Sequence, residues 1–233
     1  MKRLCYLTIG CLLLGFAACS DDDKSTGTST AVSGVENGHA WVDLGLPSGT
    51  KWATCNVGAE NPQDYGGYYA WGETSTKSVY DWITYDFLED KTTLDLENDA
   101  AHVNWGGKWV MPTRIQQEEL FNECCWVWTA SYNGTNVAGY IVYKAKSSDD
   151  KGRKVYEGES SSYSLSDTHI FLPAAGVRFD DNLVKAGTYG VFWSSSLNLD
   201  DTNSAWFIDY TSNYVHKDYD ERCSGQSVRA VIP

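Results

Sequence analysis

Polar and aromatic side chains suited to ligand contact are concentrated in residues 193–220, where Asn, Asp, Ser and Tyr dominate. Tyrosine supplies rigid contact area, whereas serine and asparagine supply adaptable hydrogen bonds, as in the binding loops of antibodies. Loops held on a rigid scaffold often carry function, so this composition favours a binding surface. The alternative is a set of solvated turns between strands, because Asn, Asp and Ser also favour turns.

Acidic side chains raise two further kinds of chemistry. Asp95, Glu97, Asn98 and Asp99 offer oxygen ligands of the type that calcium prefers, but their spacing is not that of an EF-hand loop, and helix-capping acids explain them equally well. Paired-carboxylate catalysis needs two carboxyl groups about 5–10 Å apart, and the Asp-rich loops single out no pair. We therefore predict no catalytic residue, no metal site and no cofactor, with calcium as the open alternative, and we favour a protein that is not an enzyme.

The N-terminus has the pattern of a secretory leader. Met1-Lys2-Arg3 gives a positive start, and residues 4–18 form an apolar stretch too short to span a membrane. The stretch ends at Phe16-Ala17-Ala18-Cys19, which resembles a bacterial lipobox and implies lipidation of Cys19. We expect a signal peptide at 1–18 and membrane contact through the lipid alone; the alternative is an ordinary signal peptide followed by an incidental cysteine.

An acidic run directly follows Cys19, at Asp21-Asp22-Asp23. It resembles the export signal of surface lipoproteins in the Bacteroidetes and implies a lipid-anchored position on the outer face of the outer membrane. The alternative is a solvated, charged tether. Because residues 25–38 are rich in Ser, Thr and Gly, we expect 19–38 to form a flexible tether and 39–233 to form the folded domain.

The expected domain retains four cysteines, which a leader of this type would deliver to an oxidising compartment. Four cysteines allow three complete pairings, and the residues alone do not choose between them. The chain has no Cys-x-x-Cys motif, and its four histidines lie far apart in the sequence, so no zinc site is expected. The four cysteines are Cys55, Cys124, Cys125 and Cys223.

Composition limits the remaining classes. The 233 residues suit one domain with a tail, and 42% hydrophobic with 21% charged residues excludes wholesale disorder. The net charge of −13 argues against a nucleic-acid partner, which a basic patch would have to attract.

Arg178 and Arg229 lie on apolar segments, where we expect internal salt bridges. We expect core packing rather than sugar stacking from six tryptophans: Trp71, Trp105, Trp109, Trp126, Trp128 and Trp193.

The elements that must position these residues are short strands around one main helix. Thr113 and Gln116 fit a capping box, which predicts a helix from Thr113 that ends near Cys124 and Cys125. A short helical turn is expected at 98–103 and loop over 74–98. This pattern predicts an α+β domain with long loops. Strands are expected at 41–44, 51–57, 65–73, 126–129, 138–145, 169–172, 189–195, 204–210, 213–217 and 226–232.

Nine motifs are spread across about residues 39–233. They are VDLGL at 42–46, KWATCNVGA at 51–59, YYAWGE at 68–73, DAA at 99–101, WVMPT at 109–113, CCWVW at 124–128, IFLPAAGVR at 170–178, FWSSS at 192–196 and GQSVR at 225–229. Together they resemble the motifs of the Fibrobacter succinogenes major paralogous domain. Ala230 and Cys223 depart from that pattern, which usually has proline and an aromatic residue at these positions. The family is similar to the C-type-lectin-like fold and to the variable proteins of diversity-generating retroelements.

The resemblance implies a C-type-lectin-like fold, with short twisted antiparallel strands, one main helix and long loops. It also implies a Cys55–Cys124 disulfide, which leaves Cys125 and Cys223 free or paired with each other. The sequence triplets of calcium-dependent sugar binding and the cysteine pair of sulfatase-activating enzymes are absent. The resemblance places ligand contacts on Asn198, Asp200, Asn203, Asn213, Tyr214, His216 and Tyr219.

These expectations combine into a surface-exposed lipoprotein that recognises an extracellular glycan or protein through its C-terminal loop face. One alternative is a cell-surface enzyme acting on polysaccharide or protein, which a pocket with two close carboxylates of raised pKa would favour. Another is an adhesin or a structural assembly subunit, which an unpaired strand edge would favour.

Overall fold

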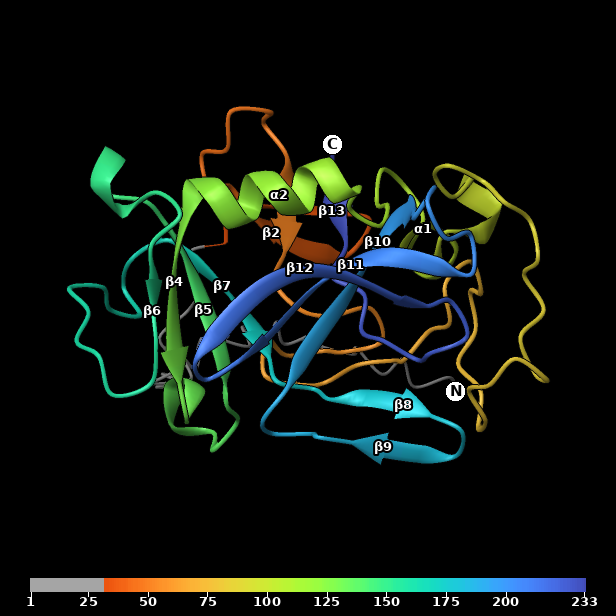
Figure 1. Cartoon of the computed structure of the whole chain (residues 1–233). Coiled ribbons are helices and arrows are strands. Elements are labelled where there is room, and N and C mark those ends of the chain that lie inside the picture. Colours follow the sequence, from red (N-terminus) through yellow and green to blue (C-terminus); the bar gives the residue numbers. More distant parts are fainter. Residues whose placement is uncertain (1–31) are drawn as a thin grey trace, which may run out of the picture.

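The computed structural model describes residues 32–233, so the expected signal peptide, Cys19 and most of the tether lie outside the described residues. The described part is mainly short strands, arranged in four sheets, with two α-helices (Figure 1). These are α1 (Ala100–Trp105) and the longer α2 (Arg114–Glu123). The predicted α+β class with one main helix is therefore confirmed. Over residues 32–233, no helix is long and apolar enough to cross a bilayer.

The first sheet joins the two ends of the described chain. Its strand order is β1-β2-β3-β13, and Val231 of the last strand pairs with Trp52. The first strand lies inside the segment expected to be tether, so the folded part begins before residue 39 and that boundary is corrected. The four strands are β1 (Gly34–Glu36), β2 (His39–Val42), β3 (Lys51–Ala53) and β13 (Val231–Ile232).

The second sheet begins directly at the end of α2. The helix stops at Glu123, and Cys124 and Cys125 are the first two residues of a strand. The sequence pattern had placed both cysteines at the end of the helix, and that prediction is corrected. Successive strand residues face opposite sides, and the two cysteines therefore enter different core clusters. The strand order is β6 (Lys154–Val155), β4 (Cys124–Thr129), β5 (Gly139–Lys144) and β7 (His169–Pro173).

The third sheet carries most of the predicted binding residues, and a separate hairpin lies on the side of the molecule away from α2 (Figure 1). This hairpin was not predicted; it turns through Asp180, whose φ is +50°, and Asp181. Segment 65–73 forms no strand, and only an isolated bridge joins Tyr69 to Gln226. The third sheet is β10 (Gly190–Leu197), β11 (Ser204–Thr211) and β12 (Tyr214–Glu221), and the hairpin is β8 (Val177–Phe179) with β9 (Asn182–Val184).

The position of α2 is set at its first turns. The capping box is present: the Thr113 hydroxyl accepts from the Gln116 amide, and the Gln116 side chain accepts from the Thr113 amide. One turn later, the buried Gln117 side chain donates to the carbonyl oxygens of Phe192 and Trp193 in β10, at 2.9 and 3.1 Å. These bonds fix the helix against the third sheet, so its exposed face borders the end of β10.

Tryptophan fills the core, as predicted. Trp71, Trp109, Trp126 and Trp193 are fully buried, Trp105 is buried, and Trp128 is partly buried. Tyr210 joins the second and third sheets, because its hydroxyl donates to the Leu172 carbonyl at 2.6 Å and its ring packs edge-on against that of Trp126. Aromatic rings therefore supply much of the packing between the sheets.

Arg229 is fully buried, and the expected salt bridge is wrong for this residue. Its guanidinium donates to neutral acceptors, namely the Asn56 side chain and the backbone carbonyls of Ala53, Thr54 and Phe171, at 2.8–3.3 Å. Burial lowers its pKa to about 10, which still leaves it charged at neutral pH. The charge is thus compensated by oriented dipoles from the first two sheets.

The four described cysteines are buried and free. Cys55 packs beside Val57 and Trp71 in one core cluster, whereas Cys124 packs with Trp126 in another. The structure therefore does not contain the Cys55–Cys124 bond that the family resemblance implies. Burial raises the pKa of the Cys124 thiol to about 12, so this group stays protonated at neutral pH.

We expect the stability of the protein to fall as the pH drops below about 6.5, in part because of His169. This side chain is 1% exposed; its Nδ1 lies 2.7 Å from the Asp167 carbonyl and its Nε2 lies 3.1 Å from the Tyr132 hydroxyl. Burial lowers its pKa, so the unfolded chain binds the proton more tightly than the folded chain does. At pH 5 the free energy of unfolding should have lost up to about 2 kcal/mol at this residue.

Urea unfolding at pH 7.5 and pH 5.0 measures the effect. Asp209 and Asp220 have pKa values raised by burial and act in the opposite direction, so the comparison must be with a His169→Gln variant. The variant should lose less stability than the original protein over the same pH interval. Equal losses in both proteins would show that His169 does not contribute.

Candidate functional site

The seven predicted binding residues do not form one cluster. They divide between the two ends of the β11–β12 hairpin, because Tyr214 pairs with Thr211 at the turn, whereas Tyr219 pairs with Trp206 near the far end. Five residues of strand separate Tyr214 from Tyr219, which places them about 17 Å apart along β12. The two ends must therefore be considered separately.

At the turn end, the predicted residues contact one another and their neighbours in the hairpin. The rings of Tyr214 and His216 stack at 4.4 Å, and the Tyr214 hydroxyl donates to Asp209 Oδ2 at 3.2 Å. Asn213 is exposed, and its side-chain oxygen accepts from the Thr211 hydroxyl across the turn. These contacts hold the turn together.

The same face of the hairpin bears two carboxyl groups of raised pKa, Asp209 and Asp220, in each case because burial disfavours the charged form. Asp209 pairs with His216, whereas Asp220 pairs with Ala205, four residues further along β11. The two carboxyl-bearing positions are therefore about 13 Å apart. Glycosidase pairs are spaced at about 5–9.5 Å, so this pair does not have their geometry.

At the other end lies a groove of about 630 Å³, which we call the β10–α2 groove. Two predicted residues, Asn198 and Asp200, line it, and a third, Tyr219, packs against its wall. Its other walls come from the first turn of α2, the end of β10 and residues 92–93, which a bridge from Thr93 to Ser196 holds against that strand. The lining includes Arg114, Ile115, Asn198, Leu199, Asp200 and Trp206.

Trp206 forms a fixed wall of this groove. The Arg114 guanidinium lies over its ring at 3.5 Å, and the Tyr219 ring meets it edge-on at 5.4 Å. Arg114 is itself held by Glu118, whose carboxylate accepts from Arg114 Nε at 3.0 Å. The wall is therefore preorganised, with a cation already stacked on the indole.

Two of the side chains that line the β10–α2 groove are large, apolar and exposed. The exposed fractions are 77% for Ile115 and 66% for Leu199. Tyr219, which packs against Trp206 beside the groove without lining it, is 49% exposed. Ile115 lies in the first turn of α2 and Leu199 lies in the loop after β10. Large apolar side chains so exposed and gathered at one groove are typical of interaction sites.

The loop after β10 is held rigidly by its own polar groups. Asn198 is buried: its amide donates to the Ser204 carbonyl at 3.0 Å, and its side-chain oxygen accepts from the Asp200 amide at 3.2 Å. Asp201 accepts from the Ser204 hydroxyl at 2.7 Å. Asn198 thus positions the loop, whereas Asp200 and Asn203 are exposed.

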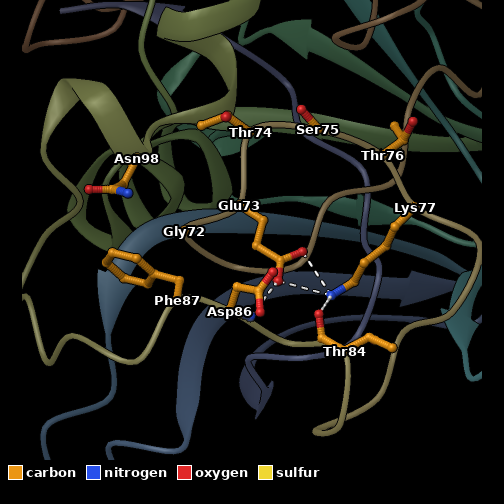
Figure 2. A pocket seen from close by; sticks show the side chains of 10 residues that line it. All are labelled: Gly72, Glu73, Thr74, Ser75, Thr76, Lys77, Thr84, Asp86, Phe87 and Asn98. Atoms are coloured by element: carbon orange, nitrogen blue, oxygen red, sulfur yellow. Dashed lines mark hydrogen bonds and ion pairs between the residues drawn. The ribbon is translucent and has the colours of Figure 1, made fainter.

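A second pocket, of about 380 Å³, lies in the long loop after Gly72 and is shown in Figure 2. Lys77 lies at its centre, 2.8 Å from a Glu73 carboxylate oxygen and 2.9 Å from the Thr84 carbonyl. The Asp86 amide donates to the same carboxylate at 2.9 Å. The charges are satisfied internally, so this constellation orders the loop, and we do not assign ligand binding to it.

Two of the four residues considered for calcium, Asp95 and Asp99, have structural partners. Asp99 caps α1 and accepts from the amides of Ala101, His102 and Met111. Asp95 forms an ion pair with Lys91 at 2.8 Å. In the part of the chain that the structure describes, no three His, Cys, Asp or Glu side chains are grouped to hold a metal ion.

Sequence reasoning missed four residues of the groove: Arg114, Ile115, Leu199 and Trp206. The sequence does carry a signal for two of them, an apolar residue at a position expected to be polar and exposed. Leu199 interrupts a polar loop, and Ile115 occupies the polar first turn of a capped helix. The approach of α2 to β10 depends on tertiary contacts that no local pattern reveals. No family model, curated protein or solved structure matches this chain, so the case for its function rests on the β10–α2 groove.

Proposed function

We propose that this protein is a non-enzymatic recognition module that binds an extracellular polypeptide through the β10–α2 groove. The observation that carries the proposal is the exposure of two apolar side chains, Ile115 and Leu199, in a preorganised groove, with the exposed Tyr219 packed beside it on Trp206. Binding energy at protein interfaces is concentrated in such apolar and aromatic anchors. The proposal includes a lipid anchor at Cys19 and display on the outer membrane, which the leader pattern and the acidic run support.

A C-type-lectin-like arrangement is part of the same proposal. It is supported by the family motifs and by one main helix packed on short antiparallel strands with long loops. In this reading, the loop face at the end of β10 carries the contacts with the ligand.

Two features favour a polypeptide over a glycan as the ligand. Arg114 already covers the Trp206 ring, so the indole is not a free platform for a sugar. Leu199 and Ile115 instead offer aliphatic contact to an apolar side chain. Asp200 adds an exposed acid at the groove, and the chain carries a net charge of −13. The expected partner segment therefore presents an apolar residue next to basic ones.

We expect Leu199→Ser and Tyr219→Ala each to weaken polypeptide binding by about tenfold or more, because each removes an exposed apolar anchor. The purified full-length protein would be screened against a displayed-peptide library, and the selected peptides would be titrated by calorimetry. Ile83→Ser is the matched control, because Ile83 is 92% exposed but lines neither the β10–α2 groove nor the pocket after Gly72.

A printed glycan array forms the second arm of this experiment. If a glycan is captured and its binding is lost in Leu199→Ser and Tyr219→Ala, the groove is a glycan site and the polypeptide assignment is wrong. If peptides bind equally well to both variants and to the original protein, the groove itself is wrongly assigned.

A further inference from the structure

A third cavity, of about 840 Å³, adjoins the pocket after Gly72, with which it shares Thr76 and Lys77, and we call it the β8 groove. One wall comes from β8 and its hairpin turn. The others come from two glycine-containing turns, at 58 and 66–67, and from segment 76–80. It shares no lining residue with the β10–α2 groove.

Arg178 of β8 is the distinctive residue of this groove. Among the described arginines, three form ion pairs with carboxylates and Arg229 donates to four neutral acceptors. Arg178 alone of this described set has neither kind of contact, and its guanidinium lies over the Tyr68 ring at 5.3 Å. A partly exposed guanidinium left unpaired in a chain of charge −13 is available for an anion from outside.

The backbone around Arg178 is fixed. Arg178 exchanges two backbone hydrogen bonds with Gly225, at 2.8 and 2.9 Å. In the adjoining wall, Tyr80 exchanges two backbone hydrogen bonds with Asp180, at 2.8 and 3.0 Å, and its hydroxyl donates to the Tyr68 carbonyl. The groove therefore needs no rearrangement to hold a ligand.

Glycine keeps the third wall free of side chains. A Cβ on Gly67 would lie 2.7 Å from the Tyr69 hydroxyl, and one on Gly58 would lie 2.9 Å from the Gly67 amide nitrogen. Only glycine lets these two turns pack this closely. The wall therefore presents backbone and aromatic surface to the cavity.

We propose that the β8 groove binds an acidic saccharide, with Arg178 forming two parallel hydrogen bonds to the sugar carboxylate. A guanidinium matches the planar geometry of a carboxylate. Exposed hydroxyls of Thr76 and Ser78 line the groove and suit the hydroxyl groups of a sugar ring. The β8 groove differs from the β10–α2 groove, since none of the exposed large apolar side chains of residues 32–233 lines it. This second site is independent of the proposed polypeptide site.

One lining residue opposes the anion and provides a test of opposite sign. Asp181 lies in the β8–β9 turn, is exposed, and accepts from the Asn182 side chain at 2.7 Å. Its charge repels a carboxylate in the groove. Removing that charge should therefore strengthen binding, whereas removing the Arg178 charge should weaken it.

The proposal is tested by titrating the purified full-length protein with sodium glucuronate at pH 7 and monitoring binding by NMR chemical shifts. We expect a dissociation constant on the order of 1 mM and much weaker binding of glucose. Arg178→Gln should weaken glucuronate binding by about tenfold, and Arg178→Lys should give an intermediate loss because it keeps the charge without the fork. Asp181→Asn should strengthen binding by about threefold.

Lys185→Gln is the matched control, because it removes an exposed cation from the end of β9 that does not line the groove. It should leave binding unchanged, and all variants should keep the thermal midpoint of the original protein. Equal binding of glucuronate to Arg178→Gln and the original protein would overturn the proposal. So would equal binding of glucose, binding of N-acetylglutamate without glucuronate, or no binding of glucuronate up to about 20 mM.

Discussion

Replacement of Arg229 by alanine is expected to lower the free energy of unfolding by about 4 kcal/mol, or to prevent folding. The side chain is 1% exposed, and it donates to acceptors in three parts of the chain: the end of β3, the segment that follows it, and β7. Alanine would leave those acceptors buried without a donor, and each such group costs about 1–3 kcal/mol. A cavity of guanidinium size would add to the loss.

Guanidinium chloride unfolding measures the effect. Arg229→Lys should recover only part of the loss, because one ammonium group cannot reach acceptors arranged around a planar fork. Arg178→Ala is the matched control: it also removes an arginine from an apolar segment, but this one is partly exposed, and a change within about 0.5 kcal/mol is expected. If Arg229→Ala unfolds within about 1 kcal/mol of the original protein, the network is not a structural centre.

Gly139→Ala should be comparably severe, with an expected loss of at least about 3 kcal/mol. Gly139 begins β5 and pairs with Pro173 of β7. A Cβ at this position would lie 2.2 Å from the Leu172 carbonyl oxygen and 2.9 Å from the Phe171 ring. The first obstacle is a backbone atom of the neighbouring strand β7 and cannot move aside as a flexible side chain could.

Gly158→Ala is the control that separates the steric clash at Gly139 from the general effect of replacing a glycine by alanine. Gly158 has a φ of +84° and nothing within 4 Å of the added Cβ, so only the strain of about 1–2 kcal/mol is expected there. Thermal unfolding followed by circular dichroism ranks the two variants. A smaller loss for Gly139→Ala than for Gly158→Ala would contradict the packing described for β5 and β7.

Features set by neighbouring residues could be predicted from the sequence. The capping box at Thr113 and the strand around Trp206 depend on local spacing, and the structure has them where they were expected. The strand predicted at 213–217 also forms, but it continues to Glu221 and so includes Tyr219, which the prediction left out. The β8–β9 hairpin was missed because three residues on each side of an Asp-Asp turn are too short for alternation to stand out. Segment 65–73 has strand-like composition, but Tyr69 finds its partner at Gln226, too far along the chain for a local pattern to predict.

The candidate site was predicted only in part, for a related reason. The polar composition of the loop after β10 indicated Asn198 and Asp200, but not that Asn198 turns inward to hold the loop. Arg114 reaches the groove only because the side chain of Gln117 fixes α2 against β10. The prediction of a salt bridge at Arg229 was wrong because the acceptors of its guanidinium are backbone carbonyls and the side-chain amide of Asn56. Every residue has a backbone carbonyl, so the sequence does not indicate which carbonyls will face a buried arginine.

The last strand of the first sheet has a consequence for the order in which the fold forms. Residues 229–233 supply the central guanidinium, the strand that pairs with β3, and the bridge from Val231 to Val110. These contacts join positions that lie far apart in the sequence, so the entropy of closing a long loop opposes them until other parts of the domain are in place. We therefore expect the β11–β12 hairpin, whose strands are close in sequence, to form before the first sheet and the Arg229 network.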